Sequence, residues 1–490
     1  MILRELADAF GKFTKQRNTD DIEVKGLEID SRSVKPGDLF FCISGFTVDG
    51  HLFAEDAINS GAVAIVAEKE LDVSVPVIVV RSTTKALALA ANVFYDNPTS
   101  KLQLFGVTGT NGKTTVTYLL NEIFNHYQKK TGLIGTIQMK IGEKTFDVKN
   151  TTPDALFLQK NFRKMVDNQV NVAFMEVSSH ALDLGRTHGC EFDIAIFTNL
   201  SQDHLDYHKN MEDYLHAKSL LFSQLGSGIN REYPKFAVIN EDDPVSQYLI
   251  KSTAQQVVTY GINSKKANVT ATDIILDANG SRFTINVNGD KWHVASKLMG
   301  RFSIYNMLAA TTAAFCAGVP INVIKSALEK TEGVRGRFEP VDGGQPFGVI
   351  VDYAHTPDSL ENVLTTVRSF VKGKVYVVVG CGGDRDRTKR PLMAKIAVDQ
   401  ADLAIFTSDN PRSEDPNQII NDMVEGIDKE NYQVILNRKE AITKSIQLAK
   451  NEDVVLIAGK GHETYQIIGE DTFEFDDKQV ALEAIQARKN

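Results

Sequence analysis

Short, continuous apolar runs dominate the hydrophobic pattern of this chain. In its middle part such runs occupy residues 101–108, 170–177, 193–200 and 236–240, and a helical pattern follows the first of them at 116–124. Apolar strands that alternate with helices are typical of a parallel sheet covered on both faces. The pattern therefore predicts an α/β domain in this part of the chain.

The last third repeats the arrangement, with apolar runs at 348–352, 374–380, 401–406, 432–436 and 453–459. Each of these runs ends on polar or glycine residues, which is where open α/β sheets bind their ligands. Residues 265–297 differ, because apolar and polar positions alternate there with a period of two. Asn279-Gly280 and Asn288-Gly289 interrupt the alternation and predict hairpin turns, so we expect an inserted antiparallel β patch.

The N-terminal part holds apolar runs at 38–43, 62–68 and 75–80 and an alanine-rich helical segment at 85–95. Polar breaks at 96–100 and 332–340 read as linkers. We therefore predict an α/β protein of three domains. These are a small N-terminal α/β domain (1–98), a central domain with a parallel sheet and the antiparallel insertion (99–334), and a C-terminal Rossmann-like α/β domain (335–490).

Composition narrows the class of protein. The 490 residues carry a net charge of −9, which argues against a broad surface for nucleic acid or anionic membranes. No long apolar run could span a bilayer, and MILRELADAF lacks the apolar core of a signal peptide. The four cysteines (Cys42, Cys190, Cys316 and Cys381) lie far apart and fit buried thiols in a reducing compartment. We expect a cytoplasmic protein, not inserted in membranes and without a nucleic-acid partner.

The segment GVTGTNGKTT (106–115) lies between a predicted strand and a predicted helix. Gly109 and Gly112 let backbone N–H groups surround phosphate oxygens, and the helix adds the positive end of its dipole. Lys113 can reach the terminal phosphates, and Thr114 offers a hydroxyl to Mg²⁺. Because Val107 stands where the common pattern has its first glycine, this is a shorter variant of the loop. The loop predicts a site for ATP or GTP.

Other candidate residues keep two interpretations on sequence grounds alone. Glu176 and His204 each follow an apolar strand and could bind Mg²⁺, but a lone histidine is more often a hydrogen-bonded loop residue. Lys218 lies on a predicted helix, where a solvated surface charge is the ordinary role. Residues 409–412, DNPR, could form only a turn, or could aim Arg412 at a ligand carboxylate.

The short loop TGTNGKTT resembles the ATP loop of the Mur ligases and the related folylpolyglutamate synthases. Further segments match the Mur ligase family in order and spacing over essentially the whole chain: EVSSHAL (176–182), TNLSQDHLDYH (198–208), LHAKSLLF (215–222), GRFSIYN (300–306), GVRGRFE (333–339) and DYAHTPDSL (352–360). The resemblance implies ATP-dependent amide formation through an acyl phosphate, in the synthesis of peptidoglycan precursors. It further implies that UDP-N-acetylmuramoyl-L-alanyl-D-glutamate accepts meso-2,6-diaminopimelate on its D-glutamate.

The resemblance also implies roles for individual residues. ATP contacts would come from Gly109, Thr110, Asn111, Gly112, Lys113, Thr114, Thr115, Asn306, Arg337, Asp352 and His355. Mg²⁺ ligands would be Thr114, Glu176, His204 and Lys218, the last as a carbamate formed with CO₂; Lys113, Glu176, His204 and Lys218 would be catalytic. The UDP-muramoyl-dipeptide would meet Ser31, Asn150, Thr151, Thr152, Ser178 and Arg186. Leu184 stands where some members carry glutamine, which puts that one contact in doubt.

Family members add chiefly diaminopimelate or L-lysine at this step. Diaminopimelate carries an extra carboxylate at its far end, which an arginine fork pairs well, whereas the same arginine repels lysine. DNPR matches the diaminopimelate type, and the implied contacts are Arg385, Asp409, Asn410, Pro411, Arg412, Gly459 and Glu463. L-lysine remains the alternative amino acid. A folylpolyglutamate synthase or a regulatory P-loop ATPase are more remote alternatives, and we expect a monomer.

Overall fold

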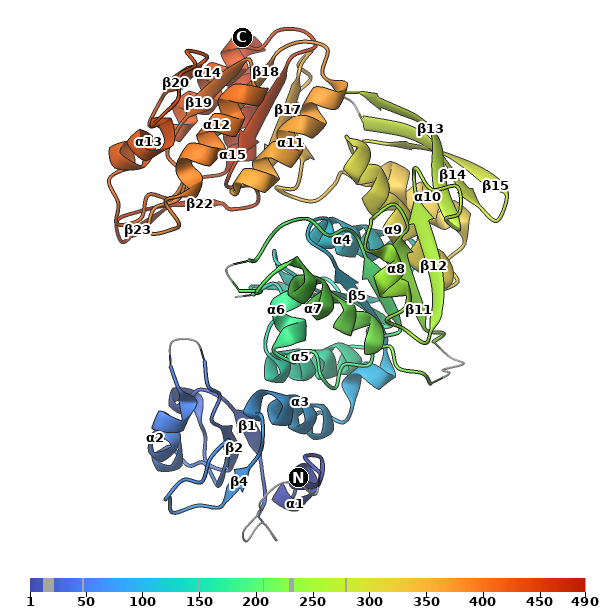
Figure 1. The fold of residues 1–490 in the computed structure, drawn as a ribbon, viewed down its shortest axis with the longest axis vertical. Coiled ribbons are helices and arrows are strands. Elements are labelled where there is room, and N and C mark those ends of the chain that lie inside the picture. Colours follow the sequence, from blue (N-terminus) through green and yellow to red (C-terminus); the bar gives the residue numbers. More distant parts are fainter. Residues whose placement is uncertain are drawn as a thin grey trace. The chain divides into compact units, whose positions relative to one another are not determined.

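The computed structural model describes residues 1–11, 22–45, 48–148, 150–205, 207–228, 233–277 and 280–489. The chain divides into two compact units, Met1–Val258 with Cys316–Val319 and Thr259–Phe315 with Pro320–Asn490 (Figure 1). Each unit is α/β, which confirms the predicted fold class. The boundaries between the three predicted domains remain a prediction.

The first unit begins with a small parallel sheet. Its strands are β1 (Gly26–Glu28), β2 (Asp38–Phe41), β3 (Ala64–Ala67) and β4 (Val77–Val79), in that spatial order. The helices are α1 (Leu3–Asp8), α2 (Ala54–Asn59) and α3 (Thr83–Phe94). Leu87, Ala90 and Ala91 of α3 pack against Leu39 and Val66 of the sheet in one core cluster. All three apolar runs predicted in this part form strands.

A larger parallel sheet follows in the same unit. Its strands run in the order β11 (Phe236–Asn240), β10 (Ile194–Phe197), β5 (Gln103–Thr108), β9 (Val172–Glu176) and β6 (Thr131–Ile134), and β7 (Met139–Ile141) and β8 (Lys144–Phe146) extend it antiparallel. Its helices are α4 (Lys113–His126), α5 (Ala155–Asp167), α6 (Ser179–Asp183), α7 (Met211–Ser223) and α8 (Ser246–Ile250). Val107 pairs with Glu176 and Thr108 with Phe197. The register therefore brings the phosphate loop and the ends of β9 and β10 to one edge.

The second unit opens with antiparallel strands β13 (Val269–Asp277), β14 (Gly280–Val287) and β15 (Asp290–Ser296). Strand β12 (Gln256–Gly261) pairs in parallel with the start of β13. Asn288 and Gly289 form the turn between β14 and β15, with φ of 53° and 91°, as a two-residue hairpin of this kind requires. The predicted β patch is confirmed, while Asn279 of the other predicted turn lies outside the described residues. Helices α9 (Arg301–Cys316) and α10 (Ile321–Lys330) follow.

The C-terminal sheet of this unit has the order β16 (Glu339–Pro340), β17 (Gly348–Asp352), β21 (Val454–Ala458), β18 (Val375–Val379), β19 (Leu403–Phe406) and β20 (Tyr432–Val434), parallel except for β16. Helices α11 (Pro357–Phe370), α12 (Lys389–Gln400) and α13 (Pro416–Val424) cover one face. Helices α14 (Arg438–Leu448) and α15 (Asp477–Lys489) cover the other (Figure 1). All five predicted strands form, and a hairpin that the pattern did not predict, β22 (Tyr465–Ile468) and β23 (Asp471–Glu474), is added.

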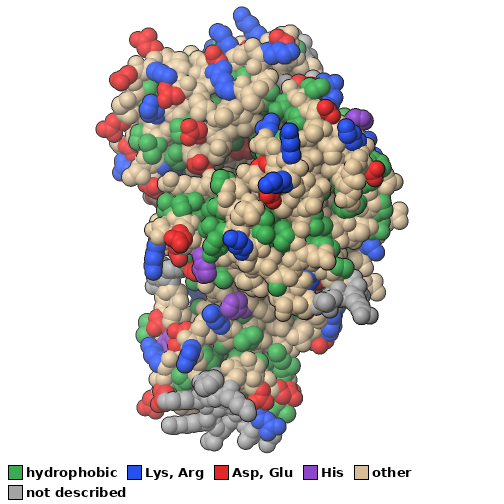
Figure 2. Space-filling model, turned by 45° about the vertical axis from the view of Figure 1, so that its right-hand side comes forward, with side chains coloured by type: hydrophobic (Ala, Val, Ile, Leu, Met, Phe, Trp, Pro, Cys, Tyr) green, Lys and Arg blue, Asp and Glu red, His purple; other side chains and the backbone are tan. Residues whose placement is uncertain are grey.

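The surface and the cysteines agree with the composition. Basic and acidic side chains are interspersed over the face shown in Figure 2. Among the described helices, none combines the length and the apolar character needed to cross a bilayer. The four cysteines are free; Cys42, Cys190 and Cys381 are buried, and burial raises the pKa of each of these thiols to about 12.

Candidate functional site

The phosphate loop joins β5 to α4 in the first unit, as predicted. Gly109 has a φ of 146°, and a Cβ at this position would overlap Thr198 Oγ1 at the end of β10. Gly112, with a φ of 87°, immediately precedes α4. Glycine is therefore needed at Gly109 both for its backbone conformation and for the close approach of the neighbouring strand.

The loop is braced from the segment that follows β10. Thr110 N donates to Asn199 O at 2.8 Å, and Asn111 N donates to Asn199 Oδ1 at 2.9 Å. Thr198 Oγ1 donates to Asn111 O at 2.6 Å. Thr115 lies half-buried in the first turn of α4. These bonds to the segment after β10 fix the course of the loop backbone.

Two lysines meet at one carbonyl of this loop. Lys113 Nζ donates to Gly109 O at 2.9 Å and to Thr110 O at 2.7 Å. Lys218 Nζ, from α7, also donates to Gly109 O at 2.9 Å and lies 4.3 Å from the centre of the Tyr214 ring. The Tyr214 hydroxyl lies 3.2 Å from Thr110 Oγ1, so Tyr214 links α7 to the loop.

Lys218 is not a surface residue, since it is only 1% exposed. The interpretation of Lys218 as a solvated charge is therefore wrong. Burial lowers the pKa of the Lys218 amine well below its ordinary value, and the charge of Lys113 lowers it further, while Asp203 acts in the opposite direction. The site thus favours an uncharged amine at this position.

Glu176, at the end of β9, is fully buried beside the loop. Its carboxylate accepts from Thr114 Oγ1 at 2.9 Å, from Thr136 N at 2.8 Å and from Thr136 Oγ1 at 2.9 Å. Gly135 makes room for it, because a Cβ there would overlap Glu176 Oε1. A carboxylate and a threonine hydroxyl next to a phosphate loop are oxygen ligands of the kind that Mg²⁺ prefers.

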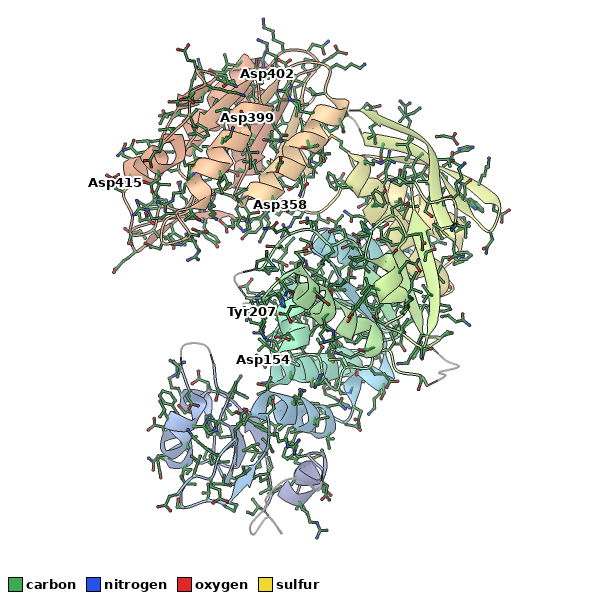
Figure 3. All side chains as sticks on the ribbon, viewed as in Figure 1. Asp154, Tyr207, Asp358, Asp399, Asp402 and Asp415 are labelled. Atoms are coloured by element: carbon green, nitrogen blue, oxygen red, sulfur yellow. The ribbon has the colours of Figure 1, made fainter. Side chains whose placement is uncertain are left out.

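His204 lies on the loop after β10 and is less deeply placed, with its side chain 41% exposed. Its backbone has a φ of 54°, and its ring lies 4.8 Å from the ring of His180 and 6.0 Å from that of Tyr214. Tyr207 stacks on His180 at 4.2 Å and donates to Asp183 at 2.6 Å, beside α6 (Figure 3). These ring contacts connect the His204 loop to His180 of α6 and to Tyr214 of α7.

The residues predicted for the muramoyl-dipeptide lie next to Glu176, except for Ser31 and Asn150. Thr152 Oγ1 donates to Glu176 O at 2.8 Å and accepts from Ser178 N at 3.0 Å. Arg186 donates to Thr152 O at 3.0 Å, and the hydroxyl groups of Thr151 and Thr136 lie 3.0 Å apart. Asn150 is exposed, and Ser31 lies half-buried in a short 3₁₀ helix (Ser31–Ser33) of the N-terminal part.

In the second unit, the predicted ATP contacts surround Tyr353. The Arg337 guanidinium lies 4.8 Å from the centre of the Tyr353 ring, and the rings of His355 and His462 lie 4.5 Å and 4.9 Å from it. Arg337 Nε and His462 Nδ1 are buried without a hydrogen-bond partner. Burial lowers the pKa of His462 to about 4, and Arg337 contributes to the shift. Neighbouring buried nitrogen atoms without partners are suited to receive a polar ligand.

The other two predicted contacts of this group are buried. Asp352, at the end of β17, accepts from Phe338 N at 2.6 Å and from Ala354 N at 2.8 Å. Burial raises the pKa of Asp352, and Arg337 opposes the shift. Asn306 lies on α9 and is 5% exposed.

The DNPR segment follows β19 and forms a braced loop. Asp409 Oδ1 accepts from Asn410 N at 2.7 Å, one residue on; an Asx-turn would use the N–H two residues on, which Pro411 lacks. Asn410 is 2% exposed, donates to Glu463 Oε2 at 2.9 Å and accepts from Lys460 Nζ at 2.9 Å. Lys460 also pairs with Glu463 Oε2 at 3.1 Å. Asn410 thus orients Glu463, and Glu463 Oε1 takes no part in these bonds.

Arg412 itself has a φ of 51°, a left-handed conformation that is uncommon for arginine. Its side chain is half-buried, and Nη1 donates to Gly383 O at 2.8 Å. Two nearby acids could have paired with Arg412, but Glu414 pairs with Arg390 at 2.8 Å and Asp415 accepts from Asn417 N at the start of α13 (Figure 3). Among the described residues no carboxylate forms an ion pair with Arg412.

The remaining predicted contacts of the amino acid lie on neighbouring loops. Gly459 follows β21 with a φ of 116°, and a Cβ there would lie 2.7 Å from Asp409 Oδ2. Arg385 is exposed and donates to its neighbour Asp384 O at 3.0 Å. Pro411 is buried, and its carbonyl occupies the space that a side chain on Gly383 would need.

Sequence reasoning missed several residues of these sites. Thr136 and Tyr214 bond Glu176 and Thr110, and Lys460, fully buried, bonds Asn410. Only Lys460 gave a usable signal, because a lysine directly after an apolar strand and a glycine is placed at the ligand-binding edge of the sheet. Among the residues that the structure describes, no three His, Cys, Asp or Glu side chains form a group able to hold a metal ion.

Comparison with known proteins gives a consistent result along the chain. The description "Mur ligase family, catalytic domain" matches residues 23–95, "Mur ligase middle domain" residues 107–314, and "Mur ligase, glutamate ligase domain" residues 336–461. A protein of Bacillus velezensis is 58% identical over 96% of each chain, and one of Oceanobacillus iheyensis is 55% identical over 100% of each chain. Both are called UDP-N-acetylmuramoyl-L-alanyl-D-glutamate–2,6-diaminopimelate ligase.

Solved structures give the same fold. A structure of a UDP-N-acetylmuramoyl-L-alanyl-D-glutamate–2,6-diaminopimelate ligase is 34% identical, with a TM-score of 0.74 over 100% of this chain and 99% of that one. The MurF ligase of Thermotoga maritima in complex with ADP is 17% identical and shares the fold, with a TM-score of 0.63 over 96% and 98% of the two chains. With three consecutive family matches and relatives of this identity over the full length, the chain belongs to the Mur ligase family.

Proposed function

We propose that this chain joins meso-2,6-diaminopimelate to the D-glutamate of UDP-N-acetylmuramoyl-L-alanyl-D-glutamate with hydrolysis of ATP to ADP and phosphate. The observation that carries the proposal is Arg412, which has no carboxylate as an ion-pair partner among the residues that the structure describes. Relatives between 51% and 58% identical that bear the name of this ligase support it. The enzyme would act in the synthesis of peptidoglycan precursors.

The reaction needs two bond-forming steps. A carboxylate oxygen of D-glutamate attacks the γ-phosphorus of ATP, and ADP leaves, so that an acyl phosphate forms. The amine of the incoming amino acid then attacks the acyl carbon, and phosphate leaves as the amide bond forms and the nitrogen loses a proton. Both steps build negative charge on oxygens, which positioned cations and N–H groups stabilise.

The residues of the phosphate loop would bind ATP in this scheme. The N–H groups of 109–115 and the start of α4 bind phosphate oxygens, and Lys113, now bonded to Gly109 O and Thr110 O, can turn to the terminal phosphate. In the other unit, Arg337 offers its buried, unpartnered Nε, with Asn306, Asp352 and His355 as further ATP contacts. We infer these roles from the family motifs together with the local geometry.

Mg²⁺ would be held by Thr114, Glu176, His204 and Lys218, the last as a carbamate. The residues present fit the ion in part, because Glu176 and Thr114 already place oxygen atoms 2.9 Å apart. When bound, Mg²⁺ neutralises phosphate charge during transfer. For Lys218, its burial and its nearness to Lys113 favour the neutral amine, the form that adds CO₂ and loses a proton to give a carbamate.

The remaining contacts are proposed on the same basis. Ser31, Asn150, Thr151, Thr152, Ser178 and Arg186 would bind the UDP-muramoyl-dipeptide, and Arg385, Asp409, Asn410, Pro411, Arg412, Gly459 and Glu463 would bind diaminopimelate. Arg412 would take the distal carboxylate, and Glu463 Oε1, left open by Asn410 and Lys460, would take an ammonium group. A monomeric state and a cytoplasmic location stay predictions.

A panel of acceptors and amino acids tests the proposal. The purified chain is given ATP, Mg²⁺ and UDP-muramoyl-dipeptide with meso-diaminopimelate or L-lysine, and ADP release and product mass are measured. We expect ADP release and a mass increase that depend on diaminopimelate. If the enzyme prefers L-lysine, then L-lysine, and not diaminopimelate, is its amino-acid substrate. ADP release with folate and glutamate, or without any carboxylate acceptor, would contradict it.

A further inference from the structure

The β22–β23 hairpin forms hydrogen bonds with the DNPR loop (residues 409–412), which carries Arg412. Arg412 N donates to Ile467 O at 3.1 Å, and Gly469 N donates to Arg412 O at 2.7 Å. Ile467 N donates to Asn410 Oδ1 at 3.0 Å. The hairpin therefore forms hydrogen bonds with the backbone N–H and C=O of Arg412 and with the side-chain oxygen of Asn410.

A side chain of the hairpin completes this contact. Gln466 Nε2 donates to Asp409 O at 2.7 Å, at the point where the loop leaves the sheet. On the inner side, Gly383 N donates to Asn410 O at 2.9 Å, and Gly383 O accepts from Arg412 Nη1 at 2.8 Å. The DNPR loop is thus hydrogen-bonded on one side to Gly383, which follows β18, and on the other side to the hairpin.

Hydrogen bonds on both sides of the loop are needed because Arg412 has a backbone conformation that arginine seldom adopts. Left-handed φ values in residues other than glycine persist only where surrounding bonds over-determine them. The hairpin meets this condition with bonds to Arg412 itself and to Asp409 and Asn410 before it. The hairpin itself is partly exposed, with Ile468 and Phe473 on its surface, and four hydrogen bonds attach it to the DNPR loop.

We propose that the β22–β23 hairpin, and Gln466 in particular, is a positioning element that fixes Arg412 for the distal carboxylate of the incoming amino acid. The inference rests on the proposed function, since it assumes that Arg412 reads that carboxylate. Gln466 is not a catalytic residue, because it acts through the backbone of the DNPR loop. Its loss should weaken recognition of diaminopimelate and leave the use of ATP intact.

The test compares Gln466→Glu with a matched control, Gln345→Glu. Gln345 Nε2 also donates to a backbone carbonyl, Val341 O, at 2.8 Å, but it lies before β17 and therefore at the opposite edge of the sheet from the DNPR loop. For Gln466→Glu we expect KM for diaminopimelate to rise about tenfold, the usual scale of one lost hydrogen bond, with kcat and KM for ATP within twofold of wild type. For Gln345→Glu all three constants should stay within twofold.

A second variant and a double variant sharpen the result. Gln466→Met removes the donor without adding charge and should raise KM for diaminopimelate in the same way. In an Arg412→Ala background, Gln466→Glu should change KM for diaminopimelate less than twofold, because Gln466 acts through the Arg412 side chain, which this background lacks. Effects that multiply in the double variant, or an unchanged KM in both single variants, would overturn the inference. If the wild type shows no ADP release with diaminopimelate, the proposed function fails, and the inference fails with it.

Discussion

Replacing Arg412 by alanine is expected to remove most of the discrimination between diaminopimelate and L-lysine. Arg412 Nη1 donates to Gly383 O at 2.8 Å and to Asn410 O at 3.5 Å, while Nε and Nη2 have no hydrogen-bond partner among the described residues and can receive a ligand. Truncating one partner of a buried, hydrogen-bonded charge pair costs about 2–5 kcal/mol, whereas an exposed pair contributes about 1 kcal/mol or less.

Because the Arg412 side chain is half-buried, the expected loss lies near the lower end of the buried range. We estimate about 2–3 kcal/mol, which corresponds to a fall of roughly 30- to 150-fold in kcat/KM for diaminopimelate. Activity with L-lysine should not fall, and it should rise if the guanidinium repels the lysine ammonium in the wild type. Arg412→Lys keeps the charge but loses the planar fork, so its loss should be smaller.

The assay is ADP release with saturating ATP and UDP-muramoyl-dipeptide, while the amino acid is varied. Thermal unfolding and KM for ATP serve as controls for the integrity of the fold and of the phosphate loop. A kcat/KM for diaminopimelate within twofold of wild type in Arg412→Ala would refute the assignment of this arginine.

Three further changes test other parts of the chain. Lys218→Ala should lose at least about 100-fold in kcat, because no carbamate can form, and added formate or acetate should restore part of it; full activity without additives would contradict the carbamate. Gly109→Ala should lower Tm and abolish detectable nucleotide binding in a calorimetric titration, because its Cβ would overlap Thr198 Oγ1. Burial raises the pKa of Asp193 to about 7, above the unfolded value near 4, so the wild type loses stability as the pH rises between these values. Asp193→Asn, which can still accept from Leu104 N, should therefore be more stable than wild type by up to about 4 kcal/mol at pH 8, with a difference that shrinks toward pH 4; a difference independent of pH in denaturant titrations would refute this.

The strands could be predicted from the sequence because a strand buried on both faces leaves a continuous apolar run. The runs at 374–380 and 453–459 became β18 and β21 at the centre of their sheet for this reason. The hairpin Tyr465–Glu474 left no such signal, since its strands are short and mostly exposed. The role proposed for it rests on the bond from the Gln466 side chain and on backbone bonds to the DNPR loop, and backbone bonds cannot be read from the sequence.

The partners of charged side chains were the least predictable part of the site. Glu414 stands two residues from Arg412 and is a natural candidate for an ion pair with it. In the structure Glu414 pairs instead with Arg390, which is fully buried on α12 and has Asp422 as a second partner. Sequence proximity does not decide such a competition, because the burial of Arg390 makes an unpaired charge there far more costly than at the half-buried Arg412.

Lys218 shows how the fold changes the chemistry of an ordinary residue. Its carbonyl partner, Gly109 O, also accepts from Lys113, so two amines share one acceptor and lie close together. If both were charged, their repulsion would act in a place where Lys218 is cut off from water. Burial and the nearby charge of Lys113 both favour Lys218 as a neutral amine, and Asp203 offsets this only in part. A neutral amine is a nucleophile toward CO₂ and a charged one is not, so the burial of Lys218, together with its nearness to Lys113, is what would make Lys218 open to modification.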